Sequence, residues 1–209
     1  MNPRLVAVIL AGGAARRMGG GDKPLLEVGG RSMLRAAIEA IGLPDIAISA
    51  NGDPSRFAAF QRPMLADGAF AGQGPLAGLL AGLTWAAGLG AETLLTVPGD
   101  MPFLPQGFAQ RLLPAPRAVV TGKQQHHLVA TWPVSCAEML RSCLERQQTR
   151  RVASFASTIG MQYVEFPVIS TASFANINTQ HQLALARRFA LSTDRSDKSA
   201  EDIWRELDE

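Results

Sequence analysis

A glycine- and cation-rich loop directly follows a short apolar run near the start of the chain. The stretch VAVILAGGAARRMGGGDKPLL, residues 6–26, places five glycines, Arg16, Arg17 and Lys23 behind six apolar residues. Glycine allows a ligand to approach the backbone closely, and the three cations neutralise negative charge. Such a loop at the end of a strand is typical of an anion site, and its length indicates polyphosphate. Lys23 is the best candidate, because Pro24 stiffens the segment that presents it.

The loop matches neither of the two common phosphate-binding fingerprints. Proline, and not serine or threonine, follows Lys23, which excludes the GxxxxGK[ST] motif. The GxGxxG spacing of dinucleotide-binding folds is absent as well. The sequence therefore indicates a different kind of polyphosphate loop and disfavours a GTPase switch.

Three further polar side chains follow apolar stretches of the chain. Asn51 ends DIAISAN, Asp67 follows MLA, and Asp100 ends ETLLTVPGD. Because ligands of open parallel sheets bind outside the carboxyl ends of the strands, we expect these side chains to converge with the loop. A lone carboxylate with phosphate oxygens and water is the usual protein site for Mg²⁺, so Asp100 is the predicted metal ligand. The alternatives are a helix-capping role for Asp100 and a simple turn role for Asn51 before Gly52.

The elements that must position these groups alternate between strand and helix over the first two thirds of the chain. Strands are predicted for residues 5–10, 45–51 and 92–99, and helices for residues 31–42 and 74–90. Pro75 suits a first helical turn, and Gly42 suits a helix C-cap. This alternation implies right-handed crossovers and a mainly parallel sheet. We therefore predict an α/β fold: a single Rossmann-like, three-layer α/β/α domain.

The remainder of the chain has a more mixed pattern. Strands are predicted for residues 117–122, 127–133 and 162–167, helices for 135–147, 150–160 and 180–191, and a turn or short strand for FANINT at 174–179. No internal repeat or linker interrupts it. Residues 1–191 are therefore assigned to one domain, and residues 192–209 to an acidic tail that is either disordered or a short helix.

Composition and charge restrict the function classes. The 209 residues are 47% hydrophobic and 18% charged, and no stretch is long and apolar enough to span a membrane. Residues 105–191 carry nine Lys and Arg against three acidic residues, a net charge of +6, whereas residues 192–209 carry a net charge of −4. The basic part would steer an anionic substrate, unless its charges merely solvate helix faces. Without aromatic interleaving or a basic run, nucleic-acid binding is disfavoured.

The cysteine and histidine patterns provide no metal site. Cys136 and Cys143 lie seven residues apart in a predicted helix, a rise of roughly 10 Å, whereas a disulfide spans at most about 7 Å. Free thiols agree with a reducing compartment, and neither a secretory nor a twin-arginine signal fits, so we expect a cytoplasmic protein. His126 and His127 are adjacent in a predicted strand and therefore point to opposite faces.

The stretch LAGGAARRMGGGDKPLLEVGGRSML resembles the signature of nucleotidyltransferases that join a nucleoside triphosphate to a phosphorylated acceptor, and most of all the molybdenum cofactor guanylyltransferases. The similarity continues in SAN, in ADG before GPLAGLLAGL, in VPGDMPFLP and in FANINT, and so covers nearly the whole core. FANINT favours the molybdopterin branch. The chain departs from the family pattern at NTQHQL, where an acidic helix start is usual, at QHHLVATW, which lacks a proline after the histidine, and in its tail.

The resemblance implies the roles of particular residues. The nucleotide-binding residues would be Leu10, Ala11, Gly12, Gly13, Lys23, Asn51, Asp67 and Asp100. The predicted catalytic residues are Lys23, Asp100 and Arg17, with Asp100 also holding Mg²⁺, and the residues on the pterin side are Asn176 and Asn178. Gly13 favours guanine, because cytidylyl- and uridylyltransferase relatives more often carry LAAG.

The resemblance also implies a reaction. GMP would pass from GTP to the terminal phosphate of molybdenum-loaded molybdopterin, with release of pyrophosphate and with Mg²⁺ as cofactor. That phosphate has a second pKa of about 6 and is therefore largely a dianion at neutral pH, so it can attack the α-phosphorus in line without a general base. The family's pathway adds a molybdenum insertase and acceptor molybdoenzymes as partners. The alternatives are a cytidylyltransferase for the same pterin, a sugar-phosphate nucleotidyltransferase, and a GTP-binding module without chemistry.

Overall fold

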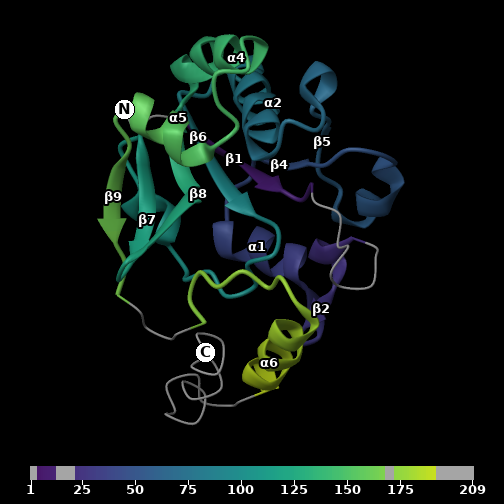
Figure 1. The fold of residues 1–209 in the computed structure, drawn as a ribbon. Coiled ribbons are helices and arrows are strands. Elements are labelled where there is room, and N and C mark those ends of the chain that lie inside the picture. Colours follow the sequence, from purple (N-terminus) through teal and green to yellow (C-terminus); the bar gives the residue numbers. More distant parts are fainter. Residues whose placement is uncertain (1–3, 13–21, 168–171, 192–209) are drawn as a thin grey trace.

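A seven-stranded sheet runs through the centre of the computed structural model, which describes residues 4–12, 22–167 and 172–191 (Figure 1). Its strands, in spatial order, are β5 (Met64–Leu65), β4 (Ile46–Ser49), β1 (Leu5–Leu10), β6 (Thr93–Pro98), β8 (Gln124–Pro133), β7 (Arg117–Thr121) and β9 (Gln162–Glu165). Among these described strands only β8 is antiparallel to its neighbours. The predicted mainly parallel sheet is therefore confirmed.

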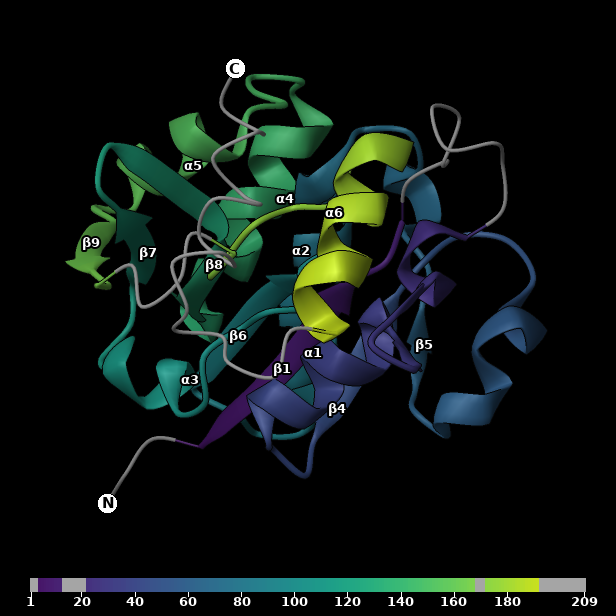
Figure 2. The ribbon, with the colours of Figure 1, turned by 90° about the horizontal axis from the view of Figure 1, so that it is seen from below.

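Helices cover both faces of this sheet. The helices are α1 (Met33–Ile41), α2 (Pro75–Gly88), α3 (Phe108–Arg111), α4 (Ala137–Glu145), α5 (Val152–Thr158) and α6 (Gln180–Leu191). Helices α1 and α3 lie on the face of the sheet that is seen in Figure 2, where their buried side chains join one apolar cluster, and those of α2, α4 and α5 join a second cluster on the other face. The three-layer α/β/α architecture is thus confirmed.

Local sequence signals explain where the first helices begin and end. Ser32 caps α1 by accepting a hydrogen bond from the Arg35 N–H at 3.2 Å, and Gly42 ends it in the left-handed conformation. Pro75 occupies the first turn of α2, where it loses no helical hydrogen bond. The predicted C-cap at Gly42 and the predicted first-turn position of Pro75 are confirmed, whereas α1 begins two residues later than predicted, because Arg31 and Ser32 form a short strand, and α2 ends two residues earlier.

A short hairpin that the sequence did not indicate packs against the predicted C-terminal helix. The strands β2 (Glu27–Val28) and β3 (Arg31–Ser32) form a hairpin, against which α6 packs through a third apolar cluster. The Arg187 side chain also donates to the Glu27 carbonyl oxygen at 3.0 Å. The C-terminal segment is therefore fixed beside the segment that follows Lys23.

Both cysteines are free, as predicted. Cys136 is buried just ahead of α4, and burial raises the pKa of its thiol to about 11. No helix among the described residues is long and apolar enough to cross a membrane. The predicted acidic tail, residues 192–209, lies outside the described residues.

Helix α2 approaches the sheet closely because it carries glycine on its buried face. A Cβ atom at Gly82 would lie 2.8 Å from a Val8 methyl carbon and 3.0 Å from a Leu94 methyl carbon. Neither neighbour can retreat, because Val8 and Leu94 are fully buried. Gly82 therefore sets the distance between α2 and the β1–β6 pair.

Replacing Gly82 with alanine is expected to lower the free energy of unfolding by about 1–3 kcal/mol, because the added methyl group overpacks the core. Gly88 on the same helix is the matched control, since a Cβ there would meet nothing within 4 Å. Gly88→Ala should be neutral or stabilising by up to about 1 kcal/mol. Urea unfolding of both variants measures the difference, and equal stability of Gly82→Ala and wild type would contradict the close packing.

His126 is expected to make stability pH-dependent. It is buried at 6% exposure, contacts the Thr121 hydroxyl at 2.8 Å and packs against the Phe174 ring. Burial lowers the pKa of His126, with the neighbouring His127 adding to the effect. The folded state therefore favours the neutral ring. Its stability is fully present above the unfolded pKa of about 6.5 and is lost, by at most about 1.4 kcal/mol per pH unit, as the pH falls from there toward the lower folded pKa.

Urea unfolding between pH 7.5 and 5.5 checks this expectation. Wild type should lose more stability over this range than His126→Gln, which carries no titrating ring at that position. Parallel pH profiles for the two proteins would exclude His126 as the source.

Candidate active site

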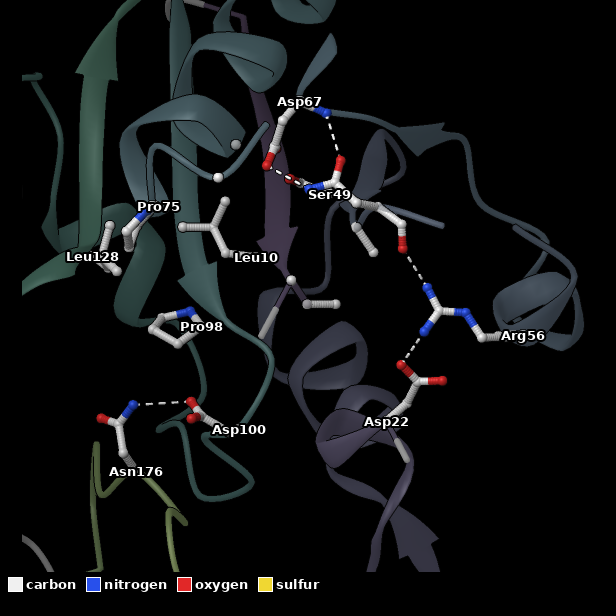
Figure 3. Close-up of a pocket in the computed structure, with 17 residues that line it drawn as sticks. Leu10, Asp22, Ser49, Arg56, Asp67, Pro75, Pro98, Asp100, Leu128 and Asn176 are labelled. Carbon is white, nitrogen blue, oxygen red and sulfur yellow. Dashed lines mark hydrogen bonds and ion pairs between the residues drawn. The ribbon is translucent and has the colours of Figure 1, made fainter. Parts of the chain in front are cut away.

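A pocket lies where the strand order of the sheet reverses. Strand β1 lies between β4 and β6 in the sheet. Both come later in the chain, and they pair with opposite edges of β1. A cavity of about 1000 Å³ opens at the carboxyl ends of these strands (Figure 3). Strand ends and the loops that follow strands line it, among them Leu10, Ala11, Gly12, Ser49, Asn51, Asp67, Pro98 and Asp100. Ligands of open α/β sheets bind at such a switch point.

Asp100 lines this pocket and forms an ion pair with Lys23 at its edge. The Lys23 ammonium group donates to one carboxylate oxygen of Asp100, and both side chains are largely buried at 15% and 17% exposure. It also donates to the Asn178 side-chain oxygen at 2.6 Å. The Asn176 amide donates to the second Asp100 oxygen at 2.9 Å (Figure 3). Four residues predicted from three separate motifs are therefore joined by direct contacts.

The strand ends explain how Lys23 reaches Asp100. Gly99 donates its backbone N–H to the Leu10 carbonyl oxygen at 3.0 Å, which holds the ends of β1 and β6 together. A Cβ atom at Gly99 would lie 3.2 Å from two carbons of the Pro24 ring. Pro24 thus packs on the backbone beside Asp100 and directs Lys23 toward it.

Asn178 and Asn176 are held by the backbone around them. The Ile177 N–H, between the two asparagines, donates to the Asp100 carbonyl oxygen at 3.0 Å. Thr179 and Gln182 form a reciprocal capping box at the start of α6, with N–H···O distances of 3.1 Å in both directions. The Gln182 side chain also accepts from the Asn178 N–H at 2.5 Å. Gln182 therefore caps the helix and orders Asn178.

The opposite wall carries a second pair of predicted residues. The Asn51 amide donates to the Asp67 carboxylate at 2.6 Å, and the Asp67 N–H donates back to the Asn51 side-chain oxygen at 2.9 Å. Helix α2 closes this wall at Gly78, where a Cβ atom would lie 2.6 Å from the Ser49 hydroxyl oxygen. The N-terminus of α2 also lines the pocket and contributes a partial positive charge there.

Arg56 is a charged pocket residue that the sequence analysis did not predict. The Arg56 guanidinium lies in the pocket wall and forms an ion pair with Asp22 (Figure 3). It follows Asn51 in the stretch NGDPSR, whose glycine and Asp–Pro pair signal a turn. That turn signal after a strand was the available clue, whereas the ion pair arises only from tertiary contact. The predicted roles of Gly13, Arg16 and Arg17 fall outside the described residues and stay predictions.

The fold and the position of the pocket are those of the nucleotide-binding α/β class. Comparison with known proteins identifies the class more closely, because the family model of the MobA-like NTP transferase domain matches residues 7–159. The chain belongs to the MobA-like NTP transferase family and is a nucleotidyltransferase.

Curated relatives support this membership over nearly the whole chain. A molybdenum cofactor guanylyltransferase of Acidiphilium cryptum is 50% identical over 184 residues, covering 87% of this chain and 93% of the relative. One from Rhodopseudomonas palustris is 40% identical over 205 residues, covering 93% and 98%. Among solved structures, molybdopterin-guanine dinucleotide biosynthesis protein A from Archaeoglobus fulgidus has a TM-score of 0.67 at 22% identity, covering 88% and 97%. This last similarity concerns the fold.

Proposed function

We propose that this enzyme transfers GMP from GTP to the terminal phosphate of molybdenum-loaded molybdopterin and releases pyrophosphate. The names of the relatives, which are 40–50% identical over most of both chains, support this acceptor and this nucleotide. The observation that carries the proposal is the cluster of Lys23, Asp100, Asn176 and Asn178 at the switch point, where Asp100 and Asn176 line the pocket. Such a cluster suits the meeting of two phosphorylated substrates, because it joins a cation, a carboxylate and two amides.

The proposed roles follow from the position of each side chain. Leu10, Ala11 and Gly12 would line the nucleotide at the end of β1, and the paired side chains of Asn51 and Asp67 would contact its nucleoside. Lys23 would bind the phosphates, exchanging its contact with Asp100 for phosphate oxygens. Asn176 and Asn178, on the C-terminal segment, would lie toward the pterin.

The chain needs no nucleophilic side chain for this reaction. The acceptor phosphate is largely a dianion at neutral pH and can attack the α-phosphorus of GTP in line. What the protein must supply is orientation and neutralisation, since two polyanions repel each other. Lys23, the N–H group of Gly12 and the N-terminus of α2 are the groups that would do so, whereas the Ala11 N–H already donates to the Ser49 carbonyl oxygen at 2.8 Å.

The Asp100 carboxylate suits Mg²⁺. Its two oxygens lie at the pocket, one accepting from Asn176 and the other from Lys23. The described residues contain no cluster of three or more His, Cys, Asp or Glu side chains, so an ion here would complete its shell with phosphate oxygens and water, as Mg²⁺ prefers. When bound, Mg²⁺ neutralises phosphate charge and stabilises departing pyrophosphate. Asn176 would hold the carboxylate in its orientation.

Pyrophosphate release tests the proposed function. With Mg²⁺ present, GTP together with molybdenum-loaded molybdopterin should release pyrophosphate, and omission of either substrate should abolish it. Tight GTP binding without release would favour the GTP-binding module. Release that requires a sugar phosphate in place of the pterin would favour the sugar-phosphate nucleotidyltransferase.

A cytoplasmic location and protein partners complete the proposal. A molybdenum insertase would deliver the pterin, and acceptor molybdoenzymes would receive the product. The net charge of +6 on residues 105–191 supports attraction of anionic substrates or partners. Pull-down with the insertase, at low and at raised salt, measures this attraction.

A further inference from the structure

Arg56 joins the two segments that flank the nucleotide side of the pocket. Its guanidinium forms an ion pair with Asp22 and donates to the carbonyl oxygens of Asn51 and, at 2.9 Å, of Asp53. The guanidinium also lies over the Phe57 ring, 5.2 Å from its centroid. Exposure is 34% for the Arg56 side chain and 17% for Asp22, so the network is partly shielded from water.

The sequence around Arg56 is organised to place this side chain. Gly52 adopts a φ of +89°, and a Cβ atom there would lie 3.3 Å from the Arg56 guanidinium. Asp53 accepts from the Ser55 N–H at 2.9 Å and from its hydroxyl at 2.6 Å, which starts the short 3₁₀ helix Pro54–Phe60. These bonds lower the pKa of Asp53 and keep it charged. Arg56 is thereby turned back toward the strand end and not toward solvent.

The partner of Arg56 directly precedes the phosphate-binding lysine. Asp22 and Lys23 are held from opposite walls: Asp22 by Arg56 beside β4, and Lys23 by Asp100 and Asn178 beside β6. The Asp22 side chain makes no capping bond to the 3₁₀ turn Lys23–Leu25 that follows. Among the described contacts of the Asp22 side chain, it is therefore the ion pair with Arg56 that holds Asp22, and with it the start of the Lys23–Leu25 turn, to the wall beside β4.

We propose that Arg56 is a positioning residue: by holding Asp22 to the end of β4, it orients Lys23 and sets the affinity for the nucleotide's triphosphate. The inference rests on the proposed phosphate-binding role of Lys23. It also gives a reason for an acidic residue at position 22. An unpaired carboxylate in the wall of a polyphosphate site would repel the ligand, whereas Asp22 is paired with Arg56.

Asp22 can act in two ways, and these predict opposite changes in GTP affinity when Asp22 is replaced by alanine. If Asp22 acts only through its charge, Asp22→Ala removes a repulsion and GTP binds more tightly. If Asp22 is a tether, the same substitution releases Lys23 and GTP binds more weakly. We expect the second result, with Arg56→Ala and Asp22→Ala each weakening GTP binding about tenfold, the size of one weakened charge-assisted contact.

The experiment measures the Kd of GTP by calorimetry in wild type, Arg56→Ala, Asp22→Ala and the double variant, together with kcat and KM. The double variant should be no weaker than either single variant, because both remove one interaction. KM should rise while kcat stays within about threefold, and Arg56→Lys should recover part of the affinity. In a Lys23→Ala background, Arg56→Ala should have no further effect.

Arg62→Ala is the matched control. Its guanidinium donates to the Pro44 carbonyl oxygen at 2.7 Å, and Arg62 does not line the pocket. Its Kd for GTP should equal that of wild type within about twofold, and thermal unfolding of all variants reports whether they fold.

Tighter or unchanged GTP binding by folded Asp22→Ala would overturn the inference, as would a full effect of Arg56→Ala without Lys23. If Arg56→Ala does not fold, the direction in which Asp22→Ala changes the Kd of GTP tests the inference by itself. Failure of wild type to bind any nucleoside triphosphate would instead count against the proposed function, so the two failures are distinguishable.

Discussion

Replacing Asp100 with asparagine is expected to lower kcat by about 10²–10³, equivalent to about 3–4 kcal/mol of activation free energy. Asparagine keeps the volume of the side chain, and its single oxygen can still accept from one of the two donors, Lys23 or Asn176, while its NH2 group loses the contact with the other. It lacks the negative charge that the proposed Mg²⁺ site requires. The effect should therefore fall on turnover more than on folding.

Steady-state pyrophosphate release at saturating GTP measures this effect, with circular dichroism to verify the fold. Asp45→Asn is the control, because Asp45 forms an exposed ion pair with Arg4 and does not line the pocket. The control should retain wild-type turnover. Wild-type rates for Asp100→Asn in Mg²⁺ would remove the metal assignment.

Replacing Lys23 with methionine is the second large expected effect. Methionine retains most of the aliphatic volume but loses the ammonium group that contacts Asp100 and Asn178. It also leaves the Asp100 charge partly unpaired in the pocket, where it would repel the triphosphate. We expect kcat/KM to fall by about 10²–10³, with KM for GTP rising and kcat falling together.

Lys123→Met is the matched control for this variant. Lys123 is exposed in the turn between β7 and β8, so its substitution removes the same charge from the protein without touching the pocket. Its kinetics should be those of wild type. An equal effect of the two variants would mean that net charge, and not the position of Lys23, determines the rate.

The sequence predicted those parts of the fold that depend on local signals. Apolar runs bounded by glycine located β1, β4 and β6, and Pro75 and Gly42 located helix ends. These features follow from backbone geometry and side-chain periodicity within a few residues. Because parallel strands end at one edge of a sheet, the convergence of Asn51, Asp67 and Asp100 could be predicted as well.

Contacts between distant segments could not be predicted in the same way. The antiparallel direction of β8, the β2–β3 hairpin and the packing of α6 on it depend on pairing between segments whose order in the chain does not determine their order in space. The contacts of Asn176 and Asn178 with Asp100 and Lys23 bring together residues more than seventy positions apart. Arg56 was missed for a related reason, because an exposed arginine has no periodicity that marks its partner.

The mass of the product tests the central claim most directly. The enzyme would be incubated with Mg²⁺, molybdenum-loaded molybdopterin and an equimolar mixture of GTP, CTP, ATP and UTP, and the pterin product analysed by mass spectrometry. The proposed function predicts one new species, the pterin joined to GMP through a pyrophosphate bond, together with an equal amount of pyrophosphate. A pterin joined to CMP would contradict the guanine assignment while keeping the fold and the site, and a pterin recovered unchanged would contradict nucleotidyl transfer to this acceptor.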